Sequence, residues 1–279
     1  MKNIFDYIRI IRPVNFFIAF LSIYVSVIIA DKSLAFSFTS FFGSLAGALI
    51  GGAGMVINDY FDYEIDKINR PKRPIPSGKI SLRSALVYYF FLNLVALILV
   101  SQTNIYAFLI ALISIVLIFF YSYKLKSKGV IGNFVVGFMT GLAFIYGGVI
   151  GRNIVPLLFP FIFGLLINFA REILKDVEDI EGDRIKNLST FPIIYGENTA
   201  LKVCNFLIVL TILSTFIPYL LKIYNVYYLL IILFGVNLPL VYSIKIIKNK
   251  PDRLKLRKIS HLIKYEMIIG LIAIYIGMN

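Results

Sequence analysis

Two acidic segments of the chain carry the residues best suited to chemistry. The first runs from Asn58 to Asp66 and directly follows a long apolar run. On a helix, residues four apart lie on one face about 6 Å apart along the axis, so Asn58, Asp62 and Asp66 form a row. Asp59 lies on a neighbouring line of the same surface. Carboxylates this close repel one another unless a positive charge lies between them, so the spacing indicates a cation-binding surface.

The second acidic segment, in the other half of the chain, repeats the D-x-x-D-x-x-x-D spacing of the first. Its members are Asp176, Asp179 and Asp183, and they again come just beyond an apolar run. A solvated run of charges has no reason to repeat its spacing. We therefore interpret the two segments as acidic clusters that face each other at a membrane surface and form a divalent-metal site.

The donor atoms of these segments select the metal. Carboxylate and amide oxygens are hard ligands, which favour Mg²⁺ or Mn²⁺ over soft metals. Mg²⁺ is typically held by one or two carboxylates, and water and substrate phosphate fill its other positions. Two facing clusters would hold two ions and clamp a pyrophosphate. The single histidine, His261, and the single cysteine, Cys204, give poor support for Ser-His-Asp catalysis, a cysteine nucleophile, or a zinc or haem site.

Basic and tyrosine side chains near the acidic segments are candidates for binding phosphate. The loop after the first segment contains Pro71, Pro74 and Pro76, so it cannot continue as one regular helix. An alternative role, anchoring the helix ends at the membrane interface, stays open for each of these side chains. The candidates for diphosphate or phosphate binding are Arg70, Lys72, Arg73, Tyr121, Tyr123, Lys124, Lys126, Arg171 and Lys175.

The elements that must position these residues are membrane helices. The chain has 279 residues, of which 59% are hydrophobic and 15% are charged, whereas a soluble domain carries about 25% charged residues. Apolar runs of about 17–22 residues recur along the chain. The sequence predicts an all-α polytopic bundle of about nine transmembrane helices, over residues 14–31, 38–57, 82–101, 104–123, 130–150, 154–172, 199–220, 226–244 and 261–278.

The distribution of basic residues predicts the orientation of these helices. With the N-terminus inside, all but three of the 28 Lys and Arg residues lie on the inner side, the exceptions being Lys32, Arg152 and Lys222. This bias follows the positive-inside rule. We therefore expect a cytoplasmic N-terminus and an active site at the cytoplasmic face of the cell membrane. The net charge of +13 then reflects topology and attraction to anionic membrane lipids, not a nucleic-acid partner.

The whole chain, residues 1–279, is expected to form one transmembrane domain with two acidic-motif halves, about 1–128 and 129–279. In the second predicted span, Gly43, Gly47 and Gly51 recur at four-residue intervals. Such a stripe of small residues lets a neighbouring backbone approach closely in lipid. Cys204 lies within a predicted span, where a lone thiol acts as a small apolar filler.

The sequence resembles the UbiA-type intramembrane prenyltransferases. The resemblance rests on Asn58-x-x-x-Asp62-x-x-x-Asp66, on Asp179-x-x-x-Asp183, on the loop Arg73-Pro74-Ile75-Pro76-Ser77-Gly78, and on nine spans across nearly the whole chain. It implies Mg²⁺-dependent transfer of a prenyl group from its diphosphate to an acceptor. It also implies that metal and diphosphate are bound by Asn58, Asp62, Asp66, Asp179 and Asp183. Asp59 and Asp176 would assist them.

Within that family, residues 171–183 look most like the archaeal ether-lipid branch. This resemblance implies geranylgeranyl diphosphate as the donor and the free glycerol hydroxyl of geranylgeranylglyceryl phosphate as the acceptor, after ionisation of the allylic diphosphate. The Tyr-x-x-x-Lys pattern of many members is altered here, because Leu125 follows Tyr121 at that spacing and lysines stand at positions 124 and 126.

Two alternatives stay open. One is a prenyltransferase of the same family that acts on an aromatic acceptor or on haem. A more distant one is a cation-coupled transporter. Transporters place ionisable groups near the bilayer midplane, whereas both acidic segments here are predicted at one face, which disfavours the transporter.

Overall fold

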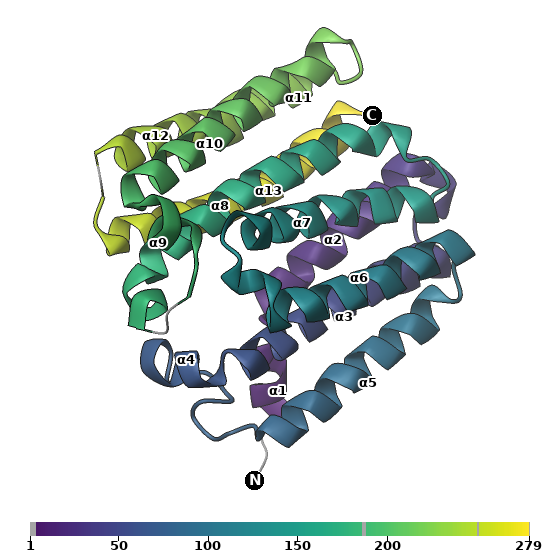
Figure 1. The fold of residues 1–279 in the computed structure, drawn as a ribbon. Helices are drawn as coiled ribbons and strands as arrows, with labels where there is room; N and C mark the ends of the chain where they lie inside the picture. The colour runs from purple at the N-terminus through teal and green to yellow at the C-terminus, as the bar shows by residue number, and fades with distance from the viewer. Residues whose placement is uncertain (1–3, 186–187, 250, 279) are drawn as a thin grey trace. The chain divides into compact units, whose positions relative to one another are not determined.

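The computed structural model describes residues 4–185, 188–249 and 251–278. Those residues form helices and connecting turns without any strand (Figure 1). Nine of their helices are long and apolar enough to cross a membrane, which confirms the predicted all-α membrane bundle. The candidate spans are α2 (Pro13–Ala30), α3 (Phe38–Phe61), α5 (Leu82–Val100), α6 (Ile105–Tyr123), α7 (Val130–Ile150), α8 (Leu158–Ile185), α10 (Glu197–Leu220), α11 to α12 (Val226–Lys248) and α13 (Arg253–Gly277).

Short helices lie between or before these spans. They are α1 (Ile4–Ile10), α4 (Tyr63–Asn69), α9 (Phe191–Tyr195) and the single turns η1 (Lys32–Leu34), η2 (Leu125–Ser127) and η3 (Val155–Leu157). Within the eighth span, α11 (Val226–Ile232) and α12 (Leu238–Lys248) are joined by a π-helical turn, η4 (Leu233–Asn237).

Several spans are longer than the sequence predicts, and their extensions carry charge. Helix α3 continues to Phe61 instead of residue 57, α8 continues to Ile185 instead of residue 172, and α13 begins at Arg253 instead of residue 261. A hydropathy pattern ends where charge begins, but the hydrogen bonds of a helix do not. The extension of α8 has its own buried face, with Ile173, Val177 and Ile180 inside, because these residues recur at helical spacing.

The chain divides into two compact units. Unit 1 comprises residues 1–125 and 145–155, and unit 2 comprises residues 126–144 and 156–279. Helix α7 contributes its first part to unit 2 and its last turns to unit 1. The expectation of a single domain with halves meeting near residue 128 stays a prediction.

In unit 1, α3 is the central helix and packs against α2, α5 and α6. At its acidic end, a buried cluster joins α1, α3, α5 and the segment 70–81, through side chains that include Ile10, Ile57, Ile75, Ile80 and Tyr89. The proline-rich segment is thus seated on the same core as the helix that carries the first acidic motif.

The closest backbone approach in unit 1 occurs at α7, not at the glycine stripe of α3. A Cβ added at Gly147 would lie 2.5 Å from Ser26 Cβ and 2.8 Å from the carbonyl oxygen of Ile23, both on α2. On α3, a Cβ at Gly47 would meet only side-chain atoms under 3.4 Å, and one at Gly51 would meet nothing within 4 Å. The stripe therefore makes room for side chains more than for a neighbouring backbone.

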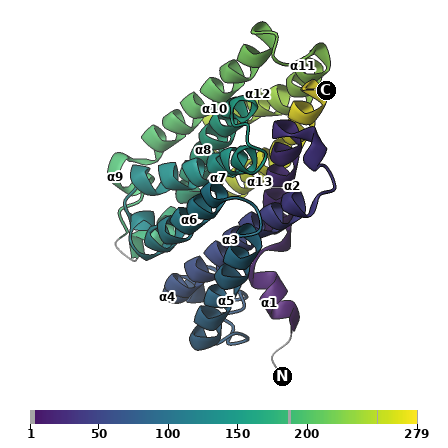
Figure 2. The ribbon, with the colours of Figure 1, turned by 90° about the vertical axis from the view of Figure 1, so that its right-hand side faces the viewer.

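In unit 2, α8 lies against α10 and α13 (Figures 1 and 2). The contact with α10 includes Cys204, which is buried and free as predicted and whose thiol donates to the carbonyl of Ala170 at 3.4 Å. At the far end, Asn225 donates through its backbone N–H to the carbonyl of Gly277 at 3.0 Å, and this bond joins the start of α11 to the end of α13. The contacts with α10 and α13 therefore position α8, the helix that carries the second acidic motif.

Candidate active site

The first acidic motif spans the junction of α3 and α4. The backbone N–H of Asp62 donates to Asn58 at 2.9 Å and that of Asp66 donates to Asp62 at 2.8 Å. This four-residue pattern runs through the junction, so the three side chains keep the single face that their spacing predicts. Asn58 also donates through Nδ2 to Asp62 Oδ2 at 2.8 Å, which orients one oxygen of that carboxylate.

The carboxylates of this motif are buried, with 2% of Asp59, 6% of Asp62 and 3% of Asp66 exposed. Buried carboxylates need positive partners, and arginines supply them. Arg73 Nη1 lies 3.0 Å from Asp59 Oδ1 and 2.5 Å from Asp66 Oδ2. Arg12 Nη2 lies 2.7 Å from the same Asp59 oxygen. Two guanidiniums therefore supply positive charge beside Asp59 and Asp66, while the predicted metal site stays a prediction.

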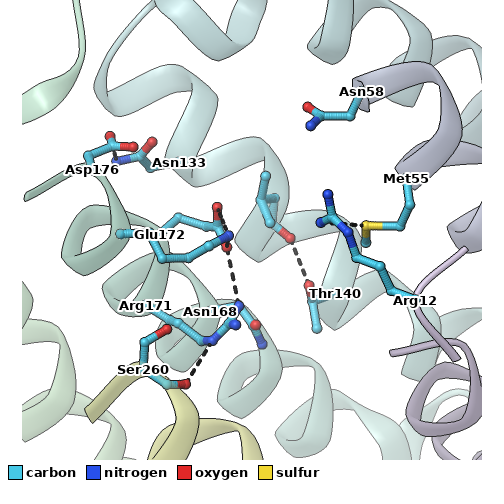
Figure 3. A network of polar contacts seen from close by, with 12 residues as sticks. Arg12, Met55, Asn58, Asn133, Thr140, Asn168, Arg171, Glu172, Asp176 and Ser260 are labelled. Atoms are coloured by element: carbon cyan, nitrogen blue, oxygen red, sulfur yellow. Dashed lines mark hydrogen bonds and ion pairs between the residues drawn. The ribbon is translucent and has the colours of Figure 1, made fainter. Parts of the chain in front are cut away.

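Arg12 belongs to the site although the sequence does not predict it there. The sequence indicates only that Arg12 is one of the basic residues on the inner side of the membrane. It precedes Pro13 at the start of α2 and has a left-handed backbone, with φ 54° and ψ 78°. Its Nη1 donates to Met55 Sδ at 3.1 Å (Figure 3), so its two nitrogens reach residues one turn apart on α3. Arg12 and Asp59 are 47 residues apart, and nothing in the local sequence marks them as partners.

Burial shifts the pKa of two groups in this cluster, Arg12 and Asp66. Burial lowers the pKa of Arg12, Asp59 opposes this shift, and the charges of Arg73 and Arg70 lower the pKa further. Burial also raises the pKa of Asp66, while Arg73 acts in the opposite direction. Of the other basic residues predicted in this segment, Arg70 caps α4 through its backbone N–H on Asp66, and Lys72 is exposed.

The second motif forms a polar stripe on α8. Asn168, Glu172, Asp176, Asp179 and Asp183 follow one another at intervals of three or four residues, so they lie on one face of this helix. Glu178 and Glu181 point elsewhere. Arg257 Nε of α13 lies 2.7 Å from Glu178 Oε1, and Arg253 of α13 pairs with Glu181. Arg253 and Arg257 therefore bind carboxylates of α8 in addition to any contact with membrane lipids.

The predicted phosphate-binding cations of α8 contact carboxylates in the structure. Lys175 Nζ lies 2.7 Å from Glu172 Oε1 and Arg171 Nη1 lies 3.4 Å from it. Arg171 Nε also donates to the carbonyl of Ser260 on α13 at 3.1 Å (Figure 3). The charge of Lys126, in η2, acts on Glu172 as well. Glu172 therefore contacts two of the cations that the sequence predicts for phosphate binding, and the charge of a third, Lys126, acts on it at longer range.

Asn133 of α7 is a second residue that sequence reasoning missed. Its Nδ2 donates to Asp176 Oδ2 at 2.8 Å (Figure 3). Asn133 is 5% exposed, so this bond lies in the interior of unit 2. An isolated asparagine in a predicted span carries no signal for such a role.

The remaining predicted residues lie at the end of α6. The Tyr123 ring packs against Phe61 of α3, with 5.5 Å between the ring centroids, and stacks on Phe119 at 6.3 Å. Lys124 is exposed and Tyr121 is half-buried. In unit 1, the structure therefore places Tyr123 beside the residue that precedes Asp62.

The donor set fits Mg²⁺. Among the described residues, no group of three or more His, Cys, Asp or Glu side chains gathers closely enough to enclose a metal ion. Mg²⁺ does not need such a cage, because it takes one or two carboxylates and completes its shell with water and phosphate. Each motif offers buried carboxylate oxygens of that number and kind.

The UbiA prenyltransferase family matches residues 19–265 of the chain. Similar proteins include several that are named digeranylgeranylglyceryl phosphate synthase. That of Methanosphaera stadtmanae is 36% identical over 97% of this chain and 98% of the relative. That of Methanocaldococcus jannaschii is 36% identical over 99% and 97%, and that of Methanobrevibacter smithii is 39% identical over 97% of each.

Solved structures show the same fold. A structure of digeranylgeranylglyceryl phosphate synthase in membranes has a TM-score of 0.79 and 35% identity, and covers 100% of this chain and 99% of the other. A UbiA homologue from Archaeoglobus fulgidus, bound to GPP and Mg²⁺, has a TM-score of 0.73 at 22% identity over 96% of this chain and 99% of the other. With its nine candidate spans and its two acidic motifs, the chain is an integral membrane prenyltransferase that belongs to the UbiA prenyltransferase family.

Proposed function

We propose that the chain transfers a geranylgeranyl group from geranylgeranyl diphosphate to the glycerol hydroxyl of geranylgeranylglyceryl phosphate, with Mg²⁺ as cofactor. The observation that carries this proposal is 36% to 39% identity, over nearly the full length of both chains, to synthases named for that product. The basic residues near the acidic motifs suit an acceptor and a donor that both carry phosphate.

Two Mg²⁺ ions are proposed, one set of ligands coming from each motif. Asn58, Asp62 and Asp66 form the first set, and Asp179 and Asp183 form the second. Asp59 and Asp176 assist, since each is held by a neighbouring side chain, Asp59 by arginines and Asp176 by Asn133. When bound, the ions neutralise the negative charge that grows on the diphosphate as it leaves.

The reaction breaks the bond between the allylic carbon and the diphosphate oxygen, and the electron pair stays on the diphosphate. The hydroxyl oxygen of the acceptor then bonds to that carbon and releases its proton. The released diphosphate and the cluster carboxylates are the bases available for this proton. Positive side chains stabilise the departing charge, and those proposed for this role are Arg70, Lys72, Arg73, Lys124, Lys126, Arg171 and Lys175, with Tyr121 and Tyr123 as hydrogen-bond donors.

The proposed location is the cell membrane, with the site at its cytoplasmic face. The support is the charge distribution, since 25 of the 28 basic residues, all except Lys32, Arg152 and Lys222, fall on one side of the nine spans. The lipid substrates fit this location, because a prenyl tail partitions into the bilayer while its diphosphate stays at the interface.

Product chromatography tests the acceptor. Purified protein is incubated with radiolabelled geranylgeranyl diphosphate, Mg²⁺ and, in separate reactions, geranylgeranylglyceryl phosphate, an aromatic acid or haem. We expect labelled product with the glycerol lipid only. Transfer to the aromatic acid or to haem would instead support the alternative within the family, and no labelled product with any of the three would refute the proposed reaction.

A further inference from the structure

Asp59 has surroundings that the proposed reaction does not explain. Only 2% of it is exposed, and a single oxygen, Oδ1, accepts from Arg12 Nη2 at 2.7 Å and from Arg73 Nη1 at 3.0 Å. A buried carboxylate that shares one oxygen between two guanidiniums is already compensated in charge. Asp59 is therefore better suited to hold arginines than to bind a metal ion.

Arg73 has a second carboxylate partner. Its Nη1 also lies 2.5 Å from Asp66 Oδ2, and Asp66 is one of the proposed magnesium ligands. A divalent cation on Asp66 and a guanidinium on the same carboxylate repel each other. Binding of the cation at Asp66 therefore competes with that Arg73 contact.

Arg12 is fixed in a way that suits it to keep Asp59 when Arg73 moves. Its backbone carbonyl accepts from the N–H groups of Asn15 at 2.8 Å and Phe16 at 3.1 Å, at the start of α2. Its side chain donates to Met55 of α3 (Figure 3) and also to Asp59 of the same helix. Arg12 is thus held at its backbone by α2 and at its guanidinium by α3, whereas Arg73 comes from the turn-rich segment 70–81.

We propose that Arg12 is a positioning residue that keeps Asp59 neutralised while Arg73 exchanges Asp66 for the diphosphate arriving with the metal ion. The inference rests on the proposed function, because it needs Asp66 to bind the metal and the donor to be a diphosphate. No covalent bond changes in this step. The guanidinium of Arg73 moves from Asp66 to the diphosphate, and the guanidinium of Arg12 stays on Asp59.

Binding of Mn²⁺, followed by electron paramagnetic resonance on purified protein, tests the exchange without turnover. Arg73→Gln removes the competitor of the metal at Asp66, so we expect Mn²⁺ alone to bind about fivefold tighter or more. Among the described residues, Arg12→Gln leaves only Arg73 to pair with Asp59, which holds Arg73 in place. We therefore expect Mn²⁺ to bind about fivefold weaker or more. A residue that only supports the fold would not give opposite shifts at these two positions.

Methylenediphosphonate serves as the diphosphate probe. We expect the probe to tighten Mn²⁺ binding in the wild type. In Arg73→Gln we expect the probe to have no effect on Mn²⁺ binding, because the guanidinium that would bind the probe is absent. Lys79→Gln is the matched control. Lys79 belongs to the same basic segment, but its side chain is 50% exposed and pairs with Asp6 at 3.4 Å, so its variant should match the wild type in both measurements.

Equal Mn²⁺ affinity in Arg12→Gln and Lys79→Gln overturns the inference, and so do shifts of the same sign in Arg12→Gln and Arg73→Gln. If Arg12→Gln does not fold, Met55→Leu removes only the sulfur contact of Arg12 and should weaken Mn²⁺ binding to a smaller extent; unchanged affinity there also overturns the inference. A failure of the proposed function differs from these outcomes, because the wild type itself would then transfer no geranylgeranyl group.

Discussion

At the scale of single residues, the two acidic motifs have different partners in spite of their shared spacing. In the first motif, Asp59 and Asp66 contact arginines and Asp62 contacts Asn58. In the second, Asp176 contacts Asn133, and cations gather on Glu172 instead. The shared spacing therefore sets which oxygens lie on one face, while the residues that hold them differ between the two units.

Asp62→Ala and Asp183→Ala should each lower kcat/KM by at least about 100-fold, because each removes an oxygen proposed to bind metal and diphosphate. The fold should remain, as measured by gel filtration and thermal denaturation in detergent. Glu181→Ala is the matched control, since Glu181 lies on the other side of α8, is 69% exposed and pairs with Arg253. Full turnover in either Asp variant would remove that residue from the site.

Lys126→Ala should raise KM for geranylgeranyl diphosphate several-fold more than Lys248→Ala. Lys126 acts on Glu172 of the cation-rich part of α8, whereas Lys248 lies exposed at the end of α12. Steady-state kinetics with each variant decides whether Lys126 binds phosphate or anchors its helix end at the membrane interface, the two roles that the sequence leaves open. Equal KM values would mean that Lys126 only anchors its helix end at the membrane interface.

At the scale of elements, apolar length predicts the spans well and their charged ends poorly. The nine predicted spans all occur, yet α3, α8 and α13 each run further into charged sequence. These extensions carry the functional groups. Asp59 lies on the last turn of α3, the second motif lies on the extension of α8, and Arg253 and Arg257 lie on the first two turns of α13. Hydropathy does not detect these extensions. A helix that leaves the bilayer keeps its backbone hydrogen bonds, and only its side chains become polar or charged.

Gly147→Ala should lower the thermal stability of the detergent-solubilised protein by several degrees. The added Cβ would lie 2.8 Å from the carbonyl of Ile23, and overpacking of this kind costs about 1–3 kcal/mol. Gly51→Ala is the control, because its Cβ would meet nothing within 4 Å and alanine favours a helix by up to about 1 kcal/mol. An unchanged midpoint for Gly147→Ala would show that α7 and α2 can separate without cost.

At the scale of the whole molecule, the sequence predicts the class, the spans and the acidic ligands, but not the partners of those ligands. Periodicity places Asn58, Asp62 and Asp66 on one face because this depends only on local helix geometry. The pairing of Asp59 with Arg12, or of Asp176 with Asn133, depends on packing between distant segments. Since 28 basic residues are available, and most are explained by topology, charge alone cannot single out Arg12.

Chelation tests the metal requirement of the intact enzyme. EDTA should reduce geranylgeranyl transfer to background, and added Mg²⁺ or Mn²⁺ should restore it, because the donor set is built of oxygen ligands. Ca²⁺ is the control cation. It prefers six to eight ligands at longer distances, so it should restore transfer less well. Transfer that persists in EDTA would contradict the proposed mechanism.

The two guanidiniums on Asp59 have a practical consequence for handling the enzyme. They act as a built-in counterion for the first motif, so removing the cofactor does not leave Asp59 and Asp66 as bare charges in a low-dielectric interior. A preparation stripped by a chelator during purification should therefore keep its melting temperature and be recoverable by dialysis into magnesium buffer. Idle periods between rounds of lipid synthesis should be equally harmless to the protein.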